Sequence, residues 1–132
     1  MSLPLHLRRP LTIALAALAA MIGLGAMYEA SATASSTQVL HISAKGGGML
    51  RFNTTHLRAR PGRVTIVMSN PSGSGISHGI ALKGPGVNKV GATVAPGHSA
   101  SVTATVRKGS YEFYCPVPGH AMAGMKGTLT VS

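Results

Sequence analysis

One short segment of the sequence gathers several side chains that can bind a metal. Cys115, the only cysteine of the chain, is followed by His120, Met122 and Met125. A thiolate, an imidazole and a thioether form a soft set of donors, and such a set suits copper. A trigonal copper site needs one more imidazole, and His78, from an adjacent predicted strand, can supply it.

A lone cysteine can also have a different role. In an exported protein an odd cysteine suggests an intermolecular disulfide, a reactive thiol or a metal ligand. Free cysteine is also among the most buried residue types and can serve as a small core side chain. The neighbours of Cys115 favour the metal ligand, because Pro116 and Pro118 stiffen the chain after a predicted strand and His120 returns on the same loop.

The other histidines and methionines lie in segments without a second type of ligand. We interpret His41 and His56 as surface or strand histidines and His98 as a turn residue. Met49 and Met68 are interpreted as core side chains.

The N-terminal segment predicts a location outside the cytoplasm. Arg8 and Arg9 precede an uncharged apolar run of 17 residues, 11–27, and small residues at 30–32 have the spacing of a signal peptidase site. Cleaved signals usually have apolar runs of about 7–15 residues, whereas a membrane span needs roughly 17–25. Residues 1–36 are therefore predicted to be a signal peptide, the preferred interpretation, or an N-terminal membrane anchor, followed by a short linker.

The chain after residue 34 is strongly basic. It carries ten Lys and Arg residues and a single acidic residue, Glu112, which gives a formal charge of about +9. Such a charge favours an acidic partner, an anionic membrane surface or an acidic medium. Nucleic acid is disfavoured as a partner, because the chain is predicted to be exported and its cations are scattered singly.

Residues 37–132 predict one all-β domain. Short segments of alternating apolar side chains recur every 8–12 residues or so between Gly and Pro turns, which is typical of an antiparallel sandwich. No segment after residue 27 has helical periodicity, and about 100 residues can bury a sufficient core without disulfides. The predicted strands are 39–42, 49–52, 63–68, 78–82, 99–106, 111–115 and 127–131.

The segment 114–130 resembles the C-terminal ligand loop of the small blue copper proteins, the cupredoxins, which include plastocyanin, azurin and sulfocyanin. Cys115 through His120, with Met125 and the following predicted strand, is similar to the azurin loop, and the longer spacing between His120 and Met125 is closer to sulfocyanin. Asn70-Pro71 before His78 is similar to the first-histidine segment of the family. The resemblance covers residues 39–132 and implies a Greek-key antiparallel β-sandwich.

The resemblance also implies a function. His78, Cys115 and His120 would hold one type 1 copper ion, cycling between Cu(I) and Cu(II), and Met125 would be the long axial ligand. Met122 is the less favoured axial candidate, because the axial methionine of the family abuts the last strand. The implied protein is a periplasmic or otherwise extracytoplasmic electron carrier, not an enzyme, that works as a monomer with redox partner proteins. Its basic charge predicts acidic partners, and residues 11–27 would mediate any membrane association.

Two residues depart from the family pattern. Gly79 stands where many members have an asparagine that ties the two ligand loops together, although its backbone N–H can still donate to the cysteine sulfur. Pro116 replaces the usual Ser or Thr. We therefore expect the rigidity of the loop to come from Pro116 and Pro118.

Two other classes of copper protein are less consistent with the sequence. An exported copper chaperone or storage protein of the same fold is the alternative, but such proteins tend to offer exposed Met and His clusters, which this sequence lacks outside the loop. A multicopper oxidase or nitrite reductase needs further copper ligands, and the chain has no His-x-His pair.

Overall fold

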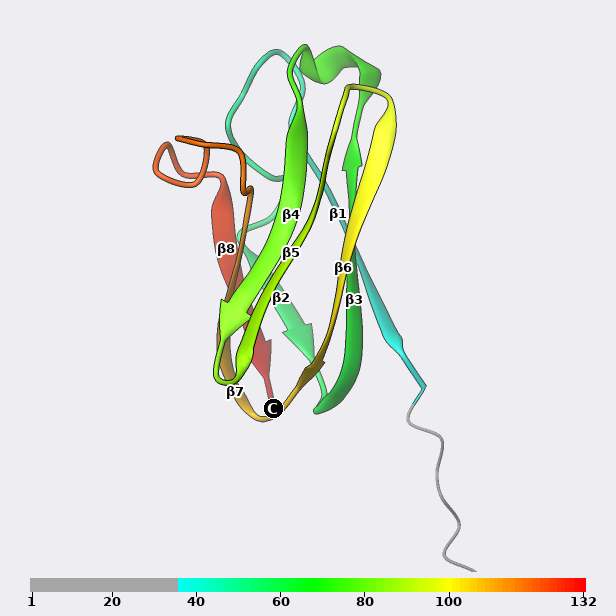
Figure 1. Cartoon of the computed structure of the whole chain (residues 1–132), viewed down its shortest axis with the longest axis vertical. Helices are drawn as coiled ribbons and strands as arrows, with labels where there is room; N and C mark the ends of the chain where they lie inside the picture. The colour runs from blue at the N-terminus through cyan, green and yellow to red at the C-terminus, as the bar shows by residue number, and fades with distance from the viewer. Residues whose placement is uncertain (1–35) are drawn as a thin grey trace, which may run out of the picture. The chain divides into compact units, whose positions relative to one another are not determined.

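The computed structural model describes residues 36–132, and its strands form two β-sheets (Figure 1). The predicted signal peptide or anchor falls on residues outside this range. Among the described residues, no helix is long and apolar enough to cross a membrane. The all-β sandwich predicted from the sequence is confirmed.

Each sheet has a simple strand order. The first runs β1–β3–β6 and the second β2–β8–β7–β4–β5. A 3-10 turn, η1 (Ser72–Ser74), precedes β4. The strands are β1 (Gln38–Ser43), β2 (His56–Ala59), β3 (Gly62–Asn70), β4 (His78–Gly84), β5 (Val87–Val94), β6 (His98–Val106), β7 (Gly109–Tyr114) and β8 (Lys126–Val131).

The core follows from the alternation of side chains along the strands. In β3, Val64, Ile66 and Met68 are fully buried, as expected when one face of a strand packs on the opposite sheet. Phe113 of β7 and Leu129 of β8 belong to the same buried cluster, so the core lies between the sheets. Each such side chain contributes about 1.5–3 kcal/mol by leaving water.

One predicted strand is wrong. Residues 49–52 form no strand, and only an isolated bridge joins Ala44 to Phe52. Gly47 and Gly48 both have positive φ and turn the chain sharply there. Met49 follows the turn and is 47% exposed, so its predicted place in the core is wrong as well.

Two strands were not predicted. The short β2 has the polar, mostly exposed sequence HLRA, and β5 has a largely exposed pattern without regular alternation. β2 pairs in parallel with β8, and β1 pairs in parallel with β3. The other four pairings are antiparallel.

The pairing of β4, β7 and β8 brings separate parts of the sequence to one end of the sandwich. Ala81 of β4 pairs with Tyr114 of β7, and Tyr114 pairs with Lys126 of β8. Because β4 runs antiparallel to β7, His78 at the start of β4 lies at the end where Cys115 follows β7. This end carries the candidate ligands.

Candidate metal centre

His78, Cys115 and His120 come together in the structure. One ligand atom from each lies within 4.8 Å of the others. The Cys115 Sγ is 3.5 Å from Nδ1 of His120, and the rings of His78 and His120 are 5.2 Å apart at an angle of 63°. One ion held at about 2 Å from each donor can reach all three with small side-chain movements.

The burial of His78 shows that this residue suits a metal ligand. His78 has no exposed surface, and neither of its ring nitrogens has a hydrogen-bond partner within the described chain. A buried polar group without a partner costs free energy, and a coordinated metal would satisfy one of the two nitrogens. Burial, and secondarily the charge of His120, lower the pKa of His78. The ring therefore stays neutral, which is the form that binds a metal.

The loop from Cys115 to Met125 is held by its own backbone. The Cys115 N–H donates to Met125 O (3.0 Å), and the Met125 N–H donates to His120 O (3.0 Å). The His120 N–H in turn donates to Val117 O (3.1 Å). These bonds fix the two loop ligands relative to each other without any metal.

Two methionines of this loop differ in environment. Met125 is fully buried, and its backbone is bonded to both loop ligands. The Met122 side chain is 92% exposed. A thioether ligand would have to lie inside the site, and of the two methionines only Met125 is buried.

Gly79 contacts the cysteine as expected from the sequence. Its N–H donates to the Cys115 Sγ at 3.4 Å. A Cβ on Gly79 would lie 2.9 Å from the Ala92 carbonyl oxygen and 3.0 Å from Cγ of Pro116. The site therefore has no room for an asparagine at this position.

Asn70 supports the site in a way that the sequence reasoning missed. It is fully buried, and its Nδ2 donates to Ile76 O and Val94 O, both at 3.0 Å. These bonds hold the segment before His78 against the end of β5. The sequence signal that could have predicted this role is the Asn70-Pro71 step, which ends a strand before a loop of Gly and Ser residues.

The other histidines of residues 36–132 lie outside the cluster. His41, His56 and His98 are all exposed, which agrees with the interpretation of His41 and His56 as surface or strand histidines. His98 is the first residue of β6, although the sequence placed it in a turn. Met68 is buried in the core as predicted.

Comparison with curated sequences identifies a relative over a short segment. Auracyanin-B of Chloroflexus aurantiacus is 57% identical over 37 residues, which are 27% of this chain. The matched segment spans only 16% of the length of that relative.

Solved structures share the fold over most of the described residues. The auracyanin B structure has a TM-score of 0.63 and 27% identity, covering 72% of this chain and 88% of that one. Auracyanin A, described as a "blue" copper protein from Chloroflexus aurantiacus, has a TM-score of 0.60 and 24% identity. That match covers 74% of this chain and all of auracyanin A.

A family model settles the relationship. The family of copper binding proteins described as plastocyanin/azurin matches residues 38–132, almost all of the described chain. The clustered nitrogen and sulfur donors of His78, Cys115 and His120 fit the metal of that family. The chain therefore belongs to the plastocyanin/azurin family of copper-binding proteins, the cupredoxins, and one type 1 copper ion is its cofactor.

Proposed function

We propose that this chain is an exported protein that carries single electrons between redox partners and catalyses no reaction of its own. Bound copper supplies a one-electron couple between Cu(I) and Cu(II). His78, Cys115 and His120, together with Met125, would hold this ion. One observation carries this proposal: two ligands are buried, whereas the third, His120, is partly exposed.

The protein contributes a fixed environment. The backbone bonds of the ligand loop and the Gly79 N–H to Cys115 hold the donors in place before a metal binds. A site whose donors are already fixed changes little when the charge on the metal changes, so electron exchange needs little rearrangement. The burial of His78 and Cys115 keeps water away from the metal.

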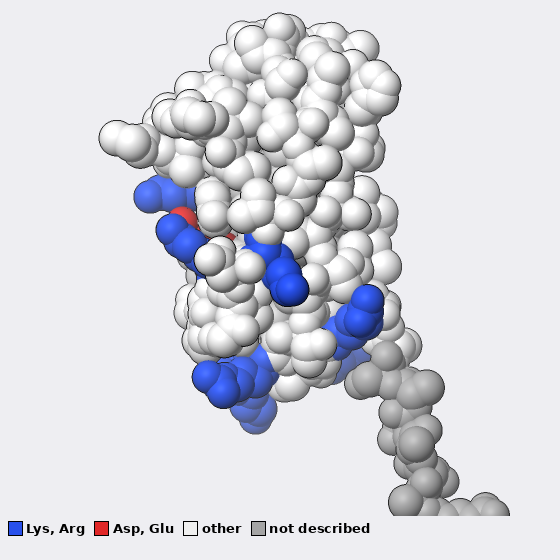
Figure 2. Space-filling view, in the orientation of Figure 1, with Lys and Arg blue, Asp and Glu red and all other residues white. Residues whose placement is uncertain are grey.

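His120 is the ligand that a partner can approach. Its neighbours Pro118, Gly119, Ala121 and Met122 are uncharged, and Met122 is almost fully exposed. On the face shown in Figure 2, the upper end of the molecule carries no Lys or Arg side chain. Transient redox encounters bury less than about 1,200 Å², and a small apolar contact of this kind suits them.

A copper chaperone or storage protein is the alternative. Transfer of copper to another protein requires ligands that the recipient can reach, and His78 and Cys115 are 0% and 1% exposed. This burial favours electron transfer over metal transfer.

The copper-loaded protein tests the two functions. We expect an intense visible band from thiolate-to-Cu(II) charge transfer and a reversible one-electron wave in voltammetry. A colourless Cu(II) complex, together with rapid loss of Cu(I) to a chelator, would identify a chaperone or store instead.

Export and membrane association rest on the N-terminal sequence and on charge. Five exposed cations surround the start of β1, and we call this group the basic end. The Gln38 side chain, at the start of β1, forms hydrogen bonds with the backbone of Arg60. Gly62, at the start of β3, pairs with Val106 at the end of β6. The cations next to these residues in the sequence therefore lie at the same end of the domain. The basic end consists of Arg58, Arg60, Arg63, Arg107 and Lys108.

The basic end would face anionic lipid if residues 11–27 anchor the chain. Only ten residues separate that run from β1, a reach of at most about 40 Å. In vesicles, a fluorophore on Ser110→Cys should approach the surface when the lipid is anionic and withdraw at high salt. If the fluorophore lies equally far from the surface of anionic and neutral vesicles, the basic end does not contact lipid.

A further inference from the structure

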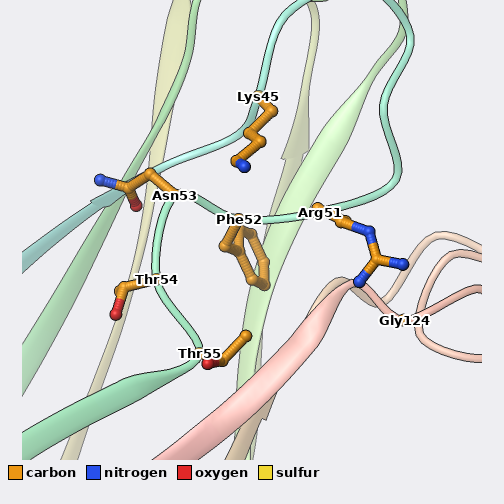
Figure 3. A pocket seen from close by; sticks show the side chains of 7 residues that line it. All are labelled: Lys45, Arg51, Phe52, Asn53, Thr54, Thr55 and Gly124. Atoms are coloured by element: carbon orange, nitrogen blue, oxygen red, sulfur yellow. The ribbon is translucent and has the colours of Figure 1, made fainter.

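A hollow lies beside the ligand loop, outside the metal centre. It has a volume of about 400 Å³ and is lined by residues 51–55 together with Lys45 and Gly124 (Figure 3). Figure 3 shows the Lys45 side chain pointing into the hollow and the Arg51 guanidinium reaching toward Gly124. We call this hollow the Lys45–Arg51 pocket.

The backbone sets the two cations opposite each other. Ala44 and Phe52 form an antiparallel bridge, and the Lys45 N–H donates to Arg51 O at 3.0 Å. Lys45 and Arg51 therefore lie opposite each other, next to this bridge. Like charges in directly opposite positions destabilise a β pairing, and a role in binding would explain why the sequence has a cation at both positions.

No acidic side chain of the described chain neutralises this pair. Glu112, the only one in residues 36–132, lies 3.0 Å from Lys83 on another strand. Within the same residues, neither the Lys45 nor the Arg51 side chain makes a hydrogen bond or an ion pair. Both cations are thus available to an outside anion.

The side-chain oxygens of the pocket are already engaged. Thr54 and Thr55 hydroxyls bond to His56, and Asn53 Oδ1 accepts the Ser43 N–H. What remains for a ligand is the Lys45 ammonium group, the Arg51 guanidinium group and the side-chain amide N–H groups of Asn53. A guanidinium matches a carboxylate with two parallel hydrogen bonds, and the ammonium adds a point charge.

The pocket adjoins the loop that carries His120. A Cβ on Gly124 would lie 3.5 Å from Nη1 of Arg51, so the guanidinium packs against the loop backbone. Gly124 immediately precedes Met125 and is four residues after His120. An anion held in the pocket would therefore sit beside the surface where a redox partner meets His120.

We propose that the Lys45–Arg51 pocket receives a carboxylate of the redox partner and so holds that partner against the ligand loop. This inference rests on the proposed electron-transfer function and gives it a partner chemistry. The sequence predicts acidic partners from its overall basic charge. The proposal attributes this preference to Lys45 and Arg51, two of the ten cations of the described chain.

Oxidation of the Cu(I) protein by hexacyanoferrate(III) tests the pocket with a defined anion. Each event moves one electron from Cu(I) to Fe(III) and leaves Cu(II) and Fe(II). At low salt we expect the double variant Lys45→Gln/Arg51→Gln to react roughly tenfold more slowly, the lower range of electrostatic rate effects. The matched control Arg107→Gln/Lys108→Gln removes the same charge from the basic end and should react less than about threefold more slowly. Equal slowing in both variants would overturn the proposal.

Competition then identifies the anion. A hexaglutamate peptide should slow the oxidation of the wild type saturably and should have little effect on the pocket variant. If inorganic phosphate at the same concentration inhibits the oxidation and the peptide does not, the pocket binds a free oxyanion. That result would overturn the proposal that the pocket docks a partner protein.

A cationic oxidant separates this inference from the proposed function. Tris(phenanthroline)cobalt(III) should oxidise the pocket variant at least as fast as the wild type. Suppose that both double variants keep the intense visible band and still react with the cobalt(III) complex, but hexacyanoferrate(III) oxidises the two variants at equal rates. In that case the pocket proposal fails and the electron-transfer proposal stands. Loss of band and reactivity in the wild type would contradict the proposed function itself.

Discussion

Gly79 and Pro116 fit against each other beside the metal centre. A Cβ on Gly79 would lie 3.0 Å from Cγ of Pro116 and 3.1 Å from its Cδ. These are the two residues at which the sequence departs from the cupredoxin pattern. The structure shows that the departures are connected, because the ring of Pro116 occupies the space that a side chain at position 79 would need.

Gly79→Asn should therefore destabilise the protein. Overpacking a filled site costs about 1–3 kcal/mol, and the added side chain would meet both Pro116 and the Ala92 carbonyl oxygen. Urea unfolding of the metal-free protein measures this cost. Gly73→Asn is the matched control, because a Cβ there has no neighbour within 4 Å and the residue has no positive φ.

A second substitution tests the coupling. Pro116→Thr in the Gly79→Asn background should recover part of the lost stability, because it removes the ring and leaves the Ala92 carbonyl. The two single costs should consequently not add in a double-mutant cycle. Strict additivity would show that the contact between Gly79 and Pro116 has no energetic weight.

The axial ligand is tested by a pair of conservative substitutions. Met125→Gln should shift the reduction potential and the visible spectrum markedly, because the axial ligand tunes a blue copper site. Met122→Gln should leave both nearly unchanged, since the Met122 side chain is 92% exposed. The reverse result would make Met122 the axial ligand.

Asn70→Ala should loosen the first-histidine segment. It removes two hydrogen bonds from a fully buried side chain, to Ile76 O and Val94 O. We expect a loss of about 1–3 kcal/mol and faster release of copper to a chelator, because His78 follows that segment. Asn88→Ala, at an exposed position of β5, is the control. Lost stability with unchanged copper release would mean that Asn70 supports only the fold.

The sequence predicted the parts of this molecule that depend on short-range pattern. The alternation in β3 and β6 identified two core strands, and the Cys115–His120–Met125 spacing identified the ligand loop. Alternation requires one buried face, and β5 lacks it because most of its side chains are exposed. This is why β5 was missed.

Long-range contacts could not be predicted in the same way. The contact of Gly79 with Pro116 depends on where β4 and the ligand loop lie in space, and so do the bonds of Asn70 to Val94. The Lys45–Arg51 pocket is a similar case, because its lining combines Lys45 and residues 51–55 with Gly124 of the ligand loop. A local pattern does not contain this information.

The metal-free protein should lose stability as the pH falls below the ordinary histidine value. The pKa of His78 is lowered from 6.5 by burial and by the charge of His120, so the unfolded chain takes up a proton first. The contribution of His78 to the free energy of unfolding is therefore fully present above about pH 6.5. Below that pH the free energy of unfolding falls by up to about 1.4 kcal/mol per pH unit. Urea unfolding at several pH values should show this slope in the wild type and in His41→Gln, and a smaller slope in His78→Gln.

The copper-loaded protein should tolerate more acid. Acid unfolding mostly reflects protonation of stabilised carboxylates, and Glu112 is the only acidic side chain in residues 36–132. We expect the Cu(II) form to remain folded to about pH 3 by circular dichroism. Cooperative unfolding of that form near pH 5 would contradict this expectation.

The apolar surface around His120 gives the last prediction. If partners meet His120 through Met122 and its uncharged neighbours, a charge placed there must lose water on contact, which costs free energy. Met122→Lys should therefore slow electron exchange with a partner protein at every salt concentration, although it increases the positive charge. Val90→Lys makes the same change at a position on β5 that is 62% exposed, and it should alter the rate only at low salt, where charges act over longer distances. Equal rates for the wild type and Met122→Lys at high salt would mean that electrons do not leave through this surface.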